Sequence, residues 1–254
     1  MLYDPYKCQC ASHASAPKNM MLQCSDASVH HLKFAHFGDY KDKIRTSRII
    51  KNGSTRSMVH CAQLCSGIEA CVSFFHNKNT RHCSLHDVIF FSPDDGTDSP
   101  GMKYYVYNEE RCSFSDDFAY SRTTGVCLKI SYADMYKNYP NSKKYCEVRN
   151  LRLAVIDSQD KYQYTVSTIR QSSRYPANRN YYIGLTDLKN EGQFVWIDGT
   201  NATWTNWRFN RPKMDKTRNC VILAGNNYYK SKLKFVDKEC KINPFRWICE
   251  KVLK

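Results

Sequence analysis

The stretch "YYIGLTDLKNEGQFVWIDGTNATWTNW", residues 181–207, contains the most distinctive pattern of the chain. Apolar runs lie on both sides of the polar segment 186–193, which predicts two strands joined by a polar turn. Three tryptophans follow the turn, at positions 196, 204 and 207. Rings of this size bury a large apolar area, so we expect a packed core around the second strand.

The flanking sequence predicts two helices and two further strands. Residues 141–171, "NSKKYCEVRNLRLAVIDSQDKYQYTVSTIRQ", have the pattern of helix, strand and helix, with Pro140 and Asn141 ahead of the first helix. Asp157 is expected to cap the second helix, with Asp160 three residues later. The segment "FRWICEKV", residues 245–252, predicts a terminal strand that contains Cys249.

In this order the motifs resemble those of the C-type lectin-like domain. The segment 182–185, Tyr-Ile-Gly-Leu, matches the family's Trp-Ile-Gly-Leu strand, with Tyr in place of Trp. Four more matches follow in the family's order: Trp196-Ile197-Asp198-Gly199, Asn206-Trp207, Asn219-Cys220-Val221 and Trp247-Ile248-Cys249-Glu250. The resemblance covers residues 111–252 and implies three bridges: Cys146–Cys249, Cys220–Cys240 and, as in the long form of the domain, Cys112–Cys127.

A different pattern occupies residues 58–85, "MVHCAQLCSGIEACVSFFHNKNTRHCSL". Cys61 and Cys65 are four residues apart and would share one face of a helix, which Gly67 would end. The pattern resembles the PAN/apple family, in which two helical cysteines precede a Cys-x-x-Phe strand, here Cys71 to Phe74, and a closing Cys83. The resemblance covers residues 24–110 and implies the bridges Cys61–Cys83 and Cys65–Cys71. A zinc site is the alternative, but these cysteine spacings do not match zinc modules, so no metal is expected.

Charge and cysteine content support two domains in an oxidising compartment. Residues 110–254 carry 26 Lys and Arg against 14 Asp and Glu, whereas the preceding residues are nearly balanced and contain all eight histidines. Thirteen cysteines favour a disulfide framework and secretion. The sequence has neither an apolar run long enough to cross a membrane nor a visible signal peptide. Asn52 and Asn201 begin N-glycosylation sequons.

The expected architecture is therefore α+β, with a PAN/apple-like sheet-plus-helix domain at 24–110 and a long-form C-type lectin-like domain at 111–252, both disulfide-bonded. Residues 1–23 are expected to be an incomplete N-terminal segment. The implied bridges leave Cys8, Cys10 and Cys24, of which one could form an intermolecular disulfide. Alternatively, Cys24 pairs with Cys112, which would leave Cys127 without its partner.

The resemblance also locates a possible ligand site. Sugar-binding members have Glu-Pro-Asn or Gln-Pro-Asp where this chain has Arg211-Pro212-Lys213, and Trp-Asn-Asp where it has Phe235-Val236-Asp237. Calcium takes six to eight oxygen ligands, and of these side-chain oxygens only that of Asp237 remains. No calcium or other cofactor is therefore expected.

The basic residues of this region suggest an anion site instead. Guanidinium and ammonium groups suit sulfate and carboxylate, and a glycan or an acidic protein would be the partner. The candidate residues are Arg208, Arg211, Lys213, Lys216, Arg218 and Asp237. A merely solvated basic face is the alternative, and Trp204 and Trp207 could stack on sugars or simply belong to the core. Nucleic acid is not expected as a partner of a secreted domain.

An enzyme is not expected, because the chain has no nucleophile elbow, His-Glu-x-x-His motif or glycine-rich phosphate loop. A protein–protein adhesion module without a glycan ligand is the alternative to calcium-independent carbohydrate binding.

Overall fold

The computed structural model describes residues 33–133, 135–213, 215–225 and 232–253. They divide into two compact units. Unit 1 takes its described residues from Met1–Ile89 and Pro93–Glu110, and unit 2 takes them from Phe90–Ser92 and Arg111–Lys254. Cys8, Cys10, Cys24 and the segment 1–23 lie outside the described residues.

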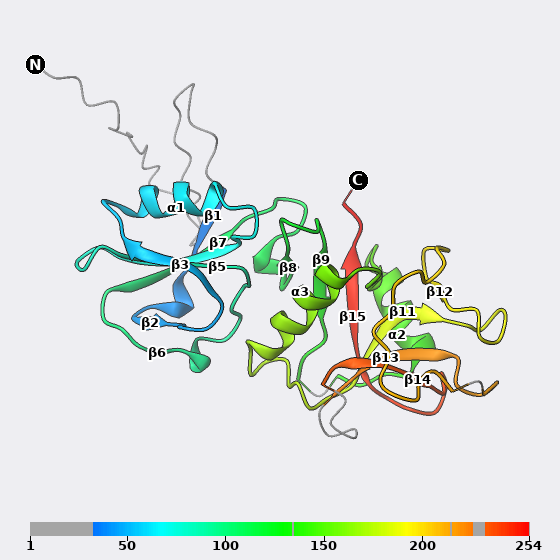
Figure 1. The fold of residues 1–254 in the computed structure, drawn as a ribbon. Coiled ribbons are helices and arrows are strands. Elements are labelled where there is room, and N and C mark those ends of the chain that lie inside the picture. The colour runs from blue at the N-terminus through cyan, green and yellow to red at the C-terminus, as the bar shows by residue number, and fades with distance from the viewer. Residues whose placement is uncertain (1–32, 134, 214, 226–231, 254) are drawn as a thin grey trace, which may run out of the picture. The chain divides into compact units, whose positions relative to one another are not determined.

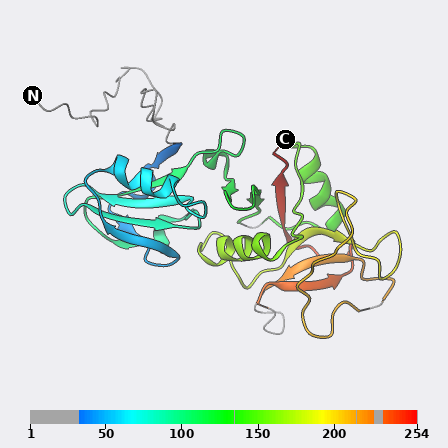
Figure 2. The same ribbon diagram turned by 45° about the horizontal axis from the view of Figure 1, so that its top comes forward.

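Unit 1 is a five-stranded antiparallel sheet with one helix, α1 (Met58–Ser66), packed on one face (Figures 1 and 2). The strand order is β1 (Phe34–Phe37), β7 (Met102–Tyr107), β4 (Ser73–Asn77), β5 (His82–His86) and β3 (Ile49–Ser54). The short strands β2 (Lys43–Ile44) and β6 (Thr97–Asp98) form a separate ribbon. Ser57 caps α1 by accepting a hydrogen bond from the N–H of His60, and Gly67 follows its last residue, as predicted.

The core of unit 1 lies between α1 and the sheet. Buried helix residues Cys61, Ala62 and Cys65 pack on sheet residues such as Phe74 and Leu85. Disulfides join Cys61 to Cys83 and Cys65 to Cys71, which are the pairs that the resemblance implies. Because these four sulfurs are bonded in pairs, they are not available as zinc ligands.

Unit 2 has a mixed sheet with the order β14 (Lys234–Lys238), β13 (Cys220–Ala224), β11 (Tyr181–Thr186), β15 (Arg246–Lys251), β9 (Cys127–Ile130) and β8 (Ala119–Tyr120). Strand β10 (Arg152–Leu153) pairs with β15, and β12 (Val195–Trp196) pairs with β11. Strands β11 and β15 run parallel, and the other pairs are antiparallel. Two helices, α2 (Tyr139–Glu147) and α3 (Gln159–Arg170), complete the unit. The α+β class is confirmed.

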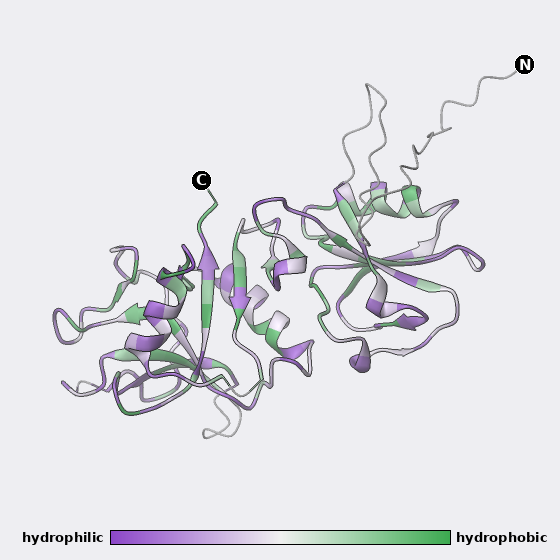
Figure 3. Cartoon of the chain, turned by 180° about the vertical axis from the view of Figure 1, so that it is seen from behind, coloured by the Kyte–Doolittle hydropathy of each residue, from purple (hydrophilic) through white to green (hydrophobic). Residues whose placement is uncertain are grey.

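The buried core of unit 2 joins α2 to the central strands. Tyr139, Tyr182 and Trp247 meet there with the disulfide of Cys146 and Cys249. The other two bridges are Cys220–Cys240 and Cys112–Cys127, so the alternative pairing of Cys112 with Cys24 is wrong for this structure. In Figure 3 the middle of β15 has the colour of hydrophobic residues and its end the colour of hydrophilic ones.

Three details differ from the sequence-based expectation. Helix α3 is capped by Ser158, which accepts from the N–H of Lys161, whereas Asp157 forms an ion pair with the Lys161 side chain at 2.9 Å. Helix α2 begins before Pro140, since Asn138 is its N-cap. The segment Phe90–Ser92 clusters with unit 2, where Phe91 contacts the rings of Phe114 and Tyr175.

Within the part of the chain that the structure describes, no helix has the length and apolarity that crossing a membrane would need.

Candidate functional site

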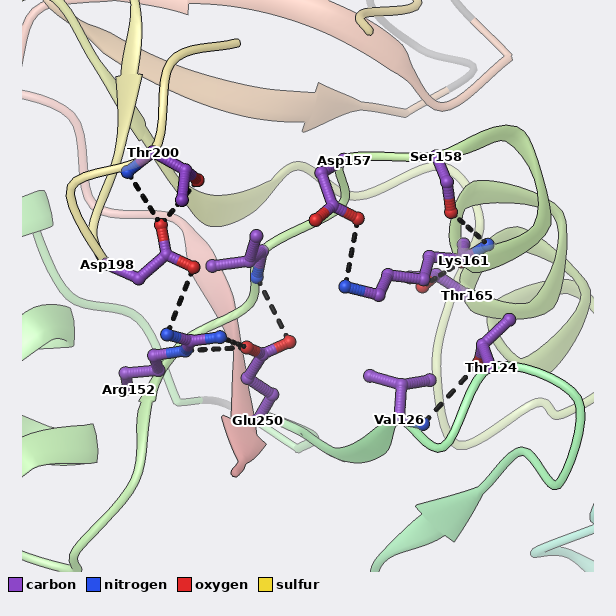
Figure 4. A network of polar contacts seen from close by, with 11 residues as sticks. Thr124, Val126, Arg152, Asp157, Ser158, Lys161, Thr165, Asp198, Thr200 and Glu250 are labelled. Atoms are coloured by element: carbon purple, nitrogen blue, oxygen red, sulfur yellow. Dashed lines mark hydrogen bonds and ion pairs between the residues drawn. The ribbon is translucent and has the colours of Figure 1, made fainter. Parts of the chain in front are cut away.

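The loop between β12 and β13, residues 197–219, is anchored at its start by the network in Figure 4. Arg152 on β10 lies between Asp198 and Glu250, with nitrogen–oxygen distances of 3.1 and 2.6 Å. The second carboxylate oxygen of Glu250 accepts from the N–H of Val155 at 3.1 Å. Asp198 also accepts hydrogen bonds from the N–H and hydroxyl of Thr200, at 3.0 and 2.6 Å. The turn that begins the loop is thus tied to β10 and β15.

The two carboxylates of this network have opposite pKa shifts. Burial raises the pKa of Glu250, and the charge and hydrogen bonds of Arg152 offset only part of that rise. Burial also acts to raise the pKa of Asp198, but the hydrogen bonds from Thr200 and the charge of Arg152 outweigh it, so its pKa is lowered. The network is therefore built to keep Asp198 ionised and fixed.

The loop next runs beside β14. The N–H of Phe235 donates to the carbonyl of Asn206 at 2.9 Å, and the N–H of Arg208 donates to the carbonyl of Phe235 at 3.0 Å. The buried Phe235 ring meets Trp204 and Trp207 edge-on, with centroids 6.0 and 5.9 Å apart. These tryptophans therefore pack on the strand, which supports the core interpretation of these rings.

This path brings Arg211 onto Asp237, at the position that the resemblance assigns to a calcium ligand. One terminal nitrogen, Nη1, lies 3.0 Å from Oδ1 and 3.2 Å from Oδ2 of the carboxylate. The Arg211 side chain is 9% exposed and that of Asp237 is fully buried. Arg211 thus neutralises the Asp237 carboxylate inside the protein, and the peptide bond from Arg211 to Pro212 is cis.

A second buried carboxylate, Asp187, lies close enough to Asp237 for the charge of Asp237 to affect its titration. Burial is the main cause that raises the pKa of Asp187, and the charge of Asp237 raises it further, against a hydrogen bond from the N–H of Gly192. The sequence interpretation missed Asp187, although the residue directly follows the apolar strand 181–186. Its position at the end of a buried strand was the signal that could have found it.

The remaining candidate residues do not converge on one point. Arg218 pairs with Asp215, Nε to Oδ2 at 3.1 Å, and Asp215 also accepts from Thr217. Lys213 and Lys216 are exposed, and neither has an ion-pair partner among the described residues. Arg208 is partly buried. Residues 226–231, which contain Tyr228, Tyr229 and Lys230, lie outside the described part.

The prediction of an anion site therefore needs one correction. Arg211 was expected to face a ligand, but its guanidinium is buried against Asp237 and is already paired. Two of the five basic candidates, Arg211 and Arg218, are thus committed to carboxylates of the chain itself. Lys213 and Lys216 keep exposed ammonium groups.

The resemblance suggests a calcium site at this position, but the residues present do not fit that ion. Calcium binds six to eight oxygen ligands, and the side chains of Arg211, Pro212, Lys213 and Val236 supply none. The carboxylate of Asp237 already faces a cation of the protein. Among the described residues, no group of three or more His, Cys, Asp or Glu side chains could hold a metal.

Comparison with known proteins agrees with the two units. Residues 24–112 match the model of the PAN domain, and residues 136–251 match the model of the lectin C-type domain. C-type lectin mosGCTL-7 of Aedes aegypti is 22% identical over 123 residues, which are 48% of this chain and 82% of that lectin. Asialoglycoprotein receptor 2 of Homo sapiens is 27% identical over 135 residues, 50% of this chain and 38% of the receptor. The chain therefore spans well under half of the human receptor that it matches.

Among solved structures, one similar to this chain is the C-type lectin domain of murine dendritic cell inhibitory receptor 2 in complex with N-glycan. It is 26% identical, and the match covers 51% of this chain and 91% of the receptor domain, with a TM-score of 0.42. The order of the motifs, the five bridges and the two family models all give the same assignment. The chain carries a PAN domain followed by a domain of the C-type lectin family.

Proposed function

We propose that this chain is a secreted, non-catalytic recognition protein whose lectin domain binds carbohydrate without calcium, with a preference for anionic or sulfated glycans. The single observation that carries the proposal is the Arg211–Asp237 pair. It supplies an internal cation at the position where sugar-binding members of the family would hold a calcium ion. A buried carboxylate needs a counter-charge, and here the chain provides its own.

The preference for anionic glycans rests on charge. Residues 110–254 carry an excess of 12 positive charges, and a surface of one sign attracts ligands of the other sign. Lys213 and Lys216 are exposed in the loop beside the pair, where they are free to meet sulfate or carboxylate groups. Acidic proteins would be drawn by the same charge. Secretion is supported by ten cysteines joined in five disulfides, which persist in oxidising compartments.

A protein ligand is the second candidate, and Phe209 is the observation that favours it. Its side chain is 86% exposed in the same loop, two residues from the paired Arg211. An exposed aromatic ring is typical of an anchor in a protein interface.

The test is retention of the full chain on three matrices: one with a heparin-like polysaccharide, one with neutral monosaccharides and one without glycan. We expect binding to the sulfated chain that weakens steeply with salt, because counter-ions screen surface charges within about 8 Å at physiological ionic strength. Retention of Phe209→Ala should be unchanged on the sulfated matrix. Equal retention on all three matrices would contradict a glycan function and leave the protein ligand.

A charge-reversed variant locates the site. Lys213→Glu with Lys216→Glu should lower retention on the sulfated matrix more than the control variant, Lys144→Glu with Lys241→Glu. Both variants lower the net charge by four, and the control places the change at two other exposed lysines of unit 2. Lys143 is unsuitable for the control, because it pairs with Glu147 at 3.6 Å. Equal loss in both variants would show diffuse attraction to a basic domain and no local site.

A further inference from the structure

Unit 2 contains an open cavity beside the end of α2. Its volume is about 290 Å³, and one of its walls is formed by residues at and after the short 3-10 helix η3 (Phe114–Asp116). Six residues line it: Asp116, Asp117, Phe118, Lys129, Arg149 and Leu151. None of them belongs to the loop between β12 and β13, so the cavity is a separate place on the lectin domain.

Two disulfides hold the walls of this cavity. Lys129 on β9 lies directly opposite Cys249 of β15, and Cys249 is bonded to Cys146 of α2. Directly opposed residues of an antiparallel pair share one face, so the Lys129 side chain is on the face of the sheet that α2 covers. The Phe118 ring packs with the Cys112–Cys127 bridge, which ends two residues before Lys129. The walls are therefore joined covalently to the core of the domain.

Two cations line the cavity, and neither pairs with a carboxylate of the described residues. The Lys129 ammonium donates to the backbone carbonyl of Asp116 at 2.8 Å and lies 5.3 Å from the centre of the Phe118 ring. The exposed Arg149 donates through Nη1 to the carbonyl of Tyr145 at 3.1 Å, and its guanidinium lies 3.7 Å from the centre of the Tyr145 ring. An ammonium has three donors and a guanidinium five, so both groups keep N–H donors for a ligand.

The two carboxylates of the cavity differ in what they contact. Asp117 is held by the chain itself, because its Oδ1 lies 2.8 Å from Nη2 of Arg174 and its Oδ2 accepts from the Tyr132 hydroxyl at 3.3 Å. Asp116 is exposed, and its carboxylate forms no ion pair within the described part of the chain. An ionised carboxylate only accepts hydrogen bonds, so Asp116 suits the hydroxyl groups of a ligand. The cavity thus offers cations for an anion beside an acceptor for hydroxyls.

We propose that this cavity is a second binding site of the lectin domain and that its ligand is an acidic sugar unit. Such a unit carries a sulfate or carboxylate group for Lys129 and Arg149, and hydroxyl groups on the same ring for Asp116. An acidic peptide side chain brings the anion without ring hydroxyls, and the Asp116 carboxylate would repel it.

The size of the cavity also favours a single sugar ring. Drug-sized ligands occupy pockets of about 300–1,000 Å³, so a cavity of about 290 Å³ suits a smaller ligand. Neither Lys213 nor Lys216 takes part in this site, which therefore stands whether or not the loop between β12 and β13 binds glycan.

The experiment titrates the full chain with four probes: N-acetylglucosamine 6-sulfate, glucuronic acid, neutral N-acetylglucosamine and inorganic sulfate. Nuclear magnetic resonance follows the backbone amides of Lys129, Arg149 and Leu151 for the cavity, and those of Lys213 and Lys216 for the loop. The two acidic sugars distinguish a sulfate ligand from a carboxylate ligand. We expect at least one of them to shift the cavity signals and to bind about tenfold more tightly than the neutral sugar or inorganic sulfate, which is the size of one lost hydrogen bond to a charged group.

Variants then test the role of each side chain. Lys129→Gln and Arg149→Gln should each weaken binding of the acidic sugar about tenfold, and Arg149→Lys, which keeps the charge, should weaken it less. Asp116→Ala should weaken binding through the lost hydroxyl acceptor, whereas it would strengthen binding if the carboxylate only repelled anions. The control is Lys144→Gln with Lys241→Gln, two exposed lysines that do not line the cavity, and it should leave the affinity unchanged. Circular dichroism verifies that each variant is folded.

Four results would overturn the cavity site. They are shifts confined to the loop amides, inorganic sulfate that binds as tightly as the acidic sugars, tighter binding by Asp116→Ala, and equal loss of affinity in the control. Shifts confined to the loop amides would leave the proposed glycan function of the loop standing, so the two proposals fail separately.

Discussion

Replacing Arg211 by methionine should destabilise unit 2 by an amount typical of a broken buried ion pair. The substitution removes the cation and leaves the carboxylate of Asp237, fully buried, without a partner. Because the Arg211 side chain is only 9% exposed, solvent screens the pair weakly. Breaking such a pair costs about 3–5 kcal/mol, and the nearby buried Asp187 adds a second carboxylate that lowers the tolerance for uncompensated charge.

The size of the effect can be separated into its parts with a double-mutant cycle. Asp237→Asn alone should cost less than Arg211→Met, since a freed arginine can turn its charged end to water whereas a buried carboxylate in β14 cannot. The double variant should recover most of the loss, with a coupling energy of about 2–3 kcal/mol. For a unit of this size, a loss of about 3 kcal/mol lowers Tm by roughly 6–12 °C.

Tryptophan fluorescence during urea unfolding is a selective assay for this prediction. All four tryptophans lie between positions 196 and 247, within unit 2. Trp204 and Trp207 contact Phe235, two residues from Asp237, so the signal reports on the strand that carries the pair. A loss below about 0.5 kcal/mol for Arg211→Met would contradict a buried ion pair, because that is the size of an exposed one.

Three further predictions concern the fold. Burial lowers the pKa of His86 to about 4, so the unfolded chain takes up a proton before the folded chain does as the pH falls. Unit 1 should therefore lose about 1.4 kcal/mol of stability per pH unit between about pH 6.5 and 4. Near-ultraviolet circular dichroism of its tyrosines would measure this loss, and His86→Gln should flatten the slope. Gly184→Ala should cost about 1–3 kcal/mol in urea unfolding, since an added Cβ would lie 2.9 Å from the carbonyl oxygen of Leu153; an unchanged midpoint would contradict the close approach. Replacing Cys112 and Cys127 together by serine should cost about 3 kcal/mol for a loop of this length, and a loss that is absent in the same assay would show that the bridge contributes nothing.

The sequence predicted the parts of the fold that depend on local pattern and motif order. The strand around Gly184 and the helix with Cys61 and Cys65 lie where periodicity put them. The cap of α3 was misplaced by one residue, because Asp157 and Ser158 are both good caps and only the backbone conformation decides between them. Phe91 was assigned to the first domain, since position along the chain does not show which aromatic rings a side chain will meet.

The candidate site was harder to predict, for a reason that is visible at Arg211. Arginine is seldom buried, and an exposed anion-binding role was the natural expectation for it. Its partner, Asp237, is 26 residues away, and only the path of the loop beside β14 brings the two side chains together. The exposure of Lys213 and Lys216 follows ordinary lysine behaviour and needed no such long-range information.

Calcium-independent glycan binding is tested most directly by the affinity of the full chain for a sulfated polysaccharide, titrated first with a calcium chelator and then with millimolar calcium. We expect the same dissociation constant in both conditions, because Arg211 already neutralises the carboxylate that would otherwise need the ion. Binding that appears only with calcium, or no binding to the sulfated polysaccharide in either condition, would contradict calcium-independent binding of anionic glycans.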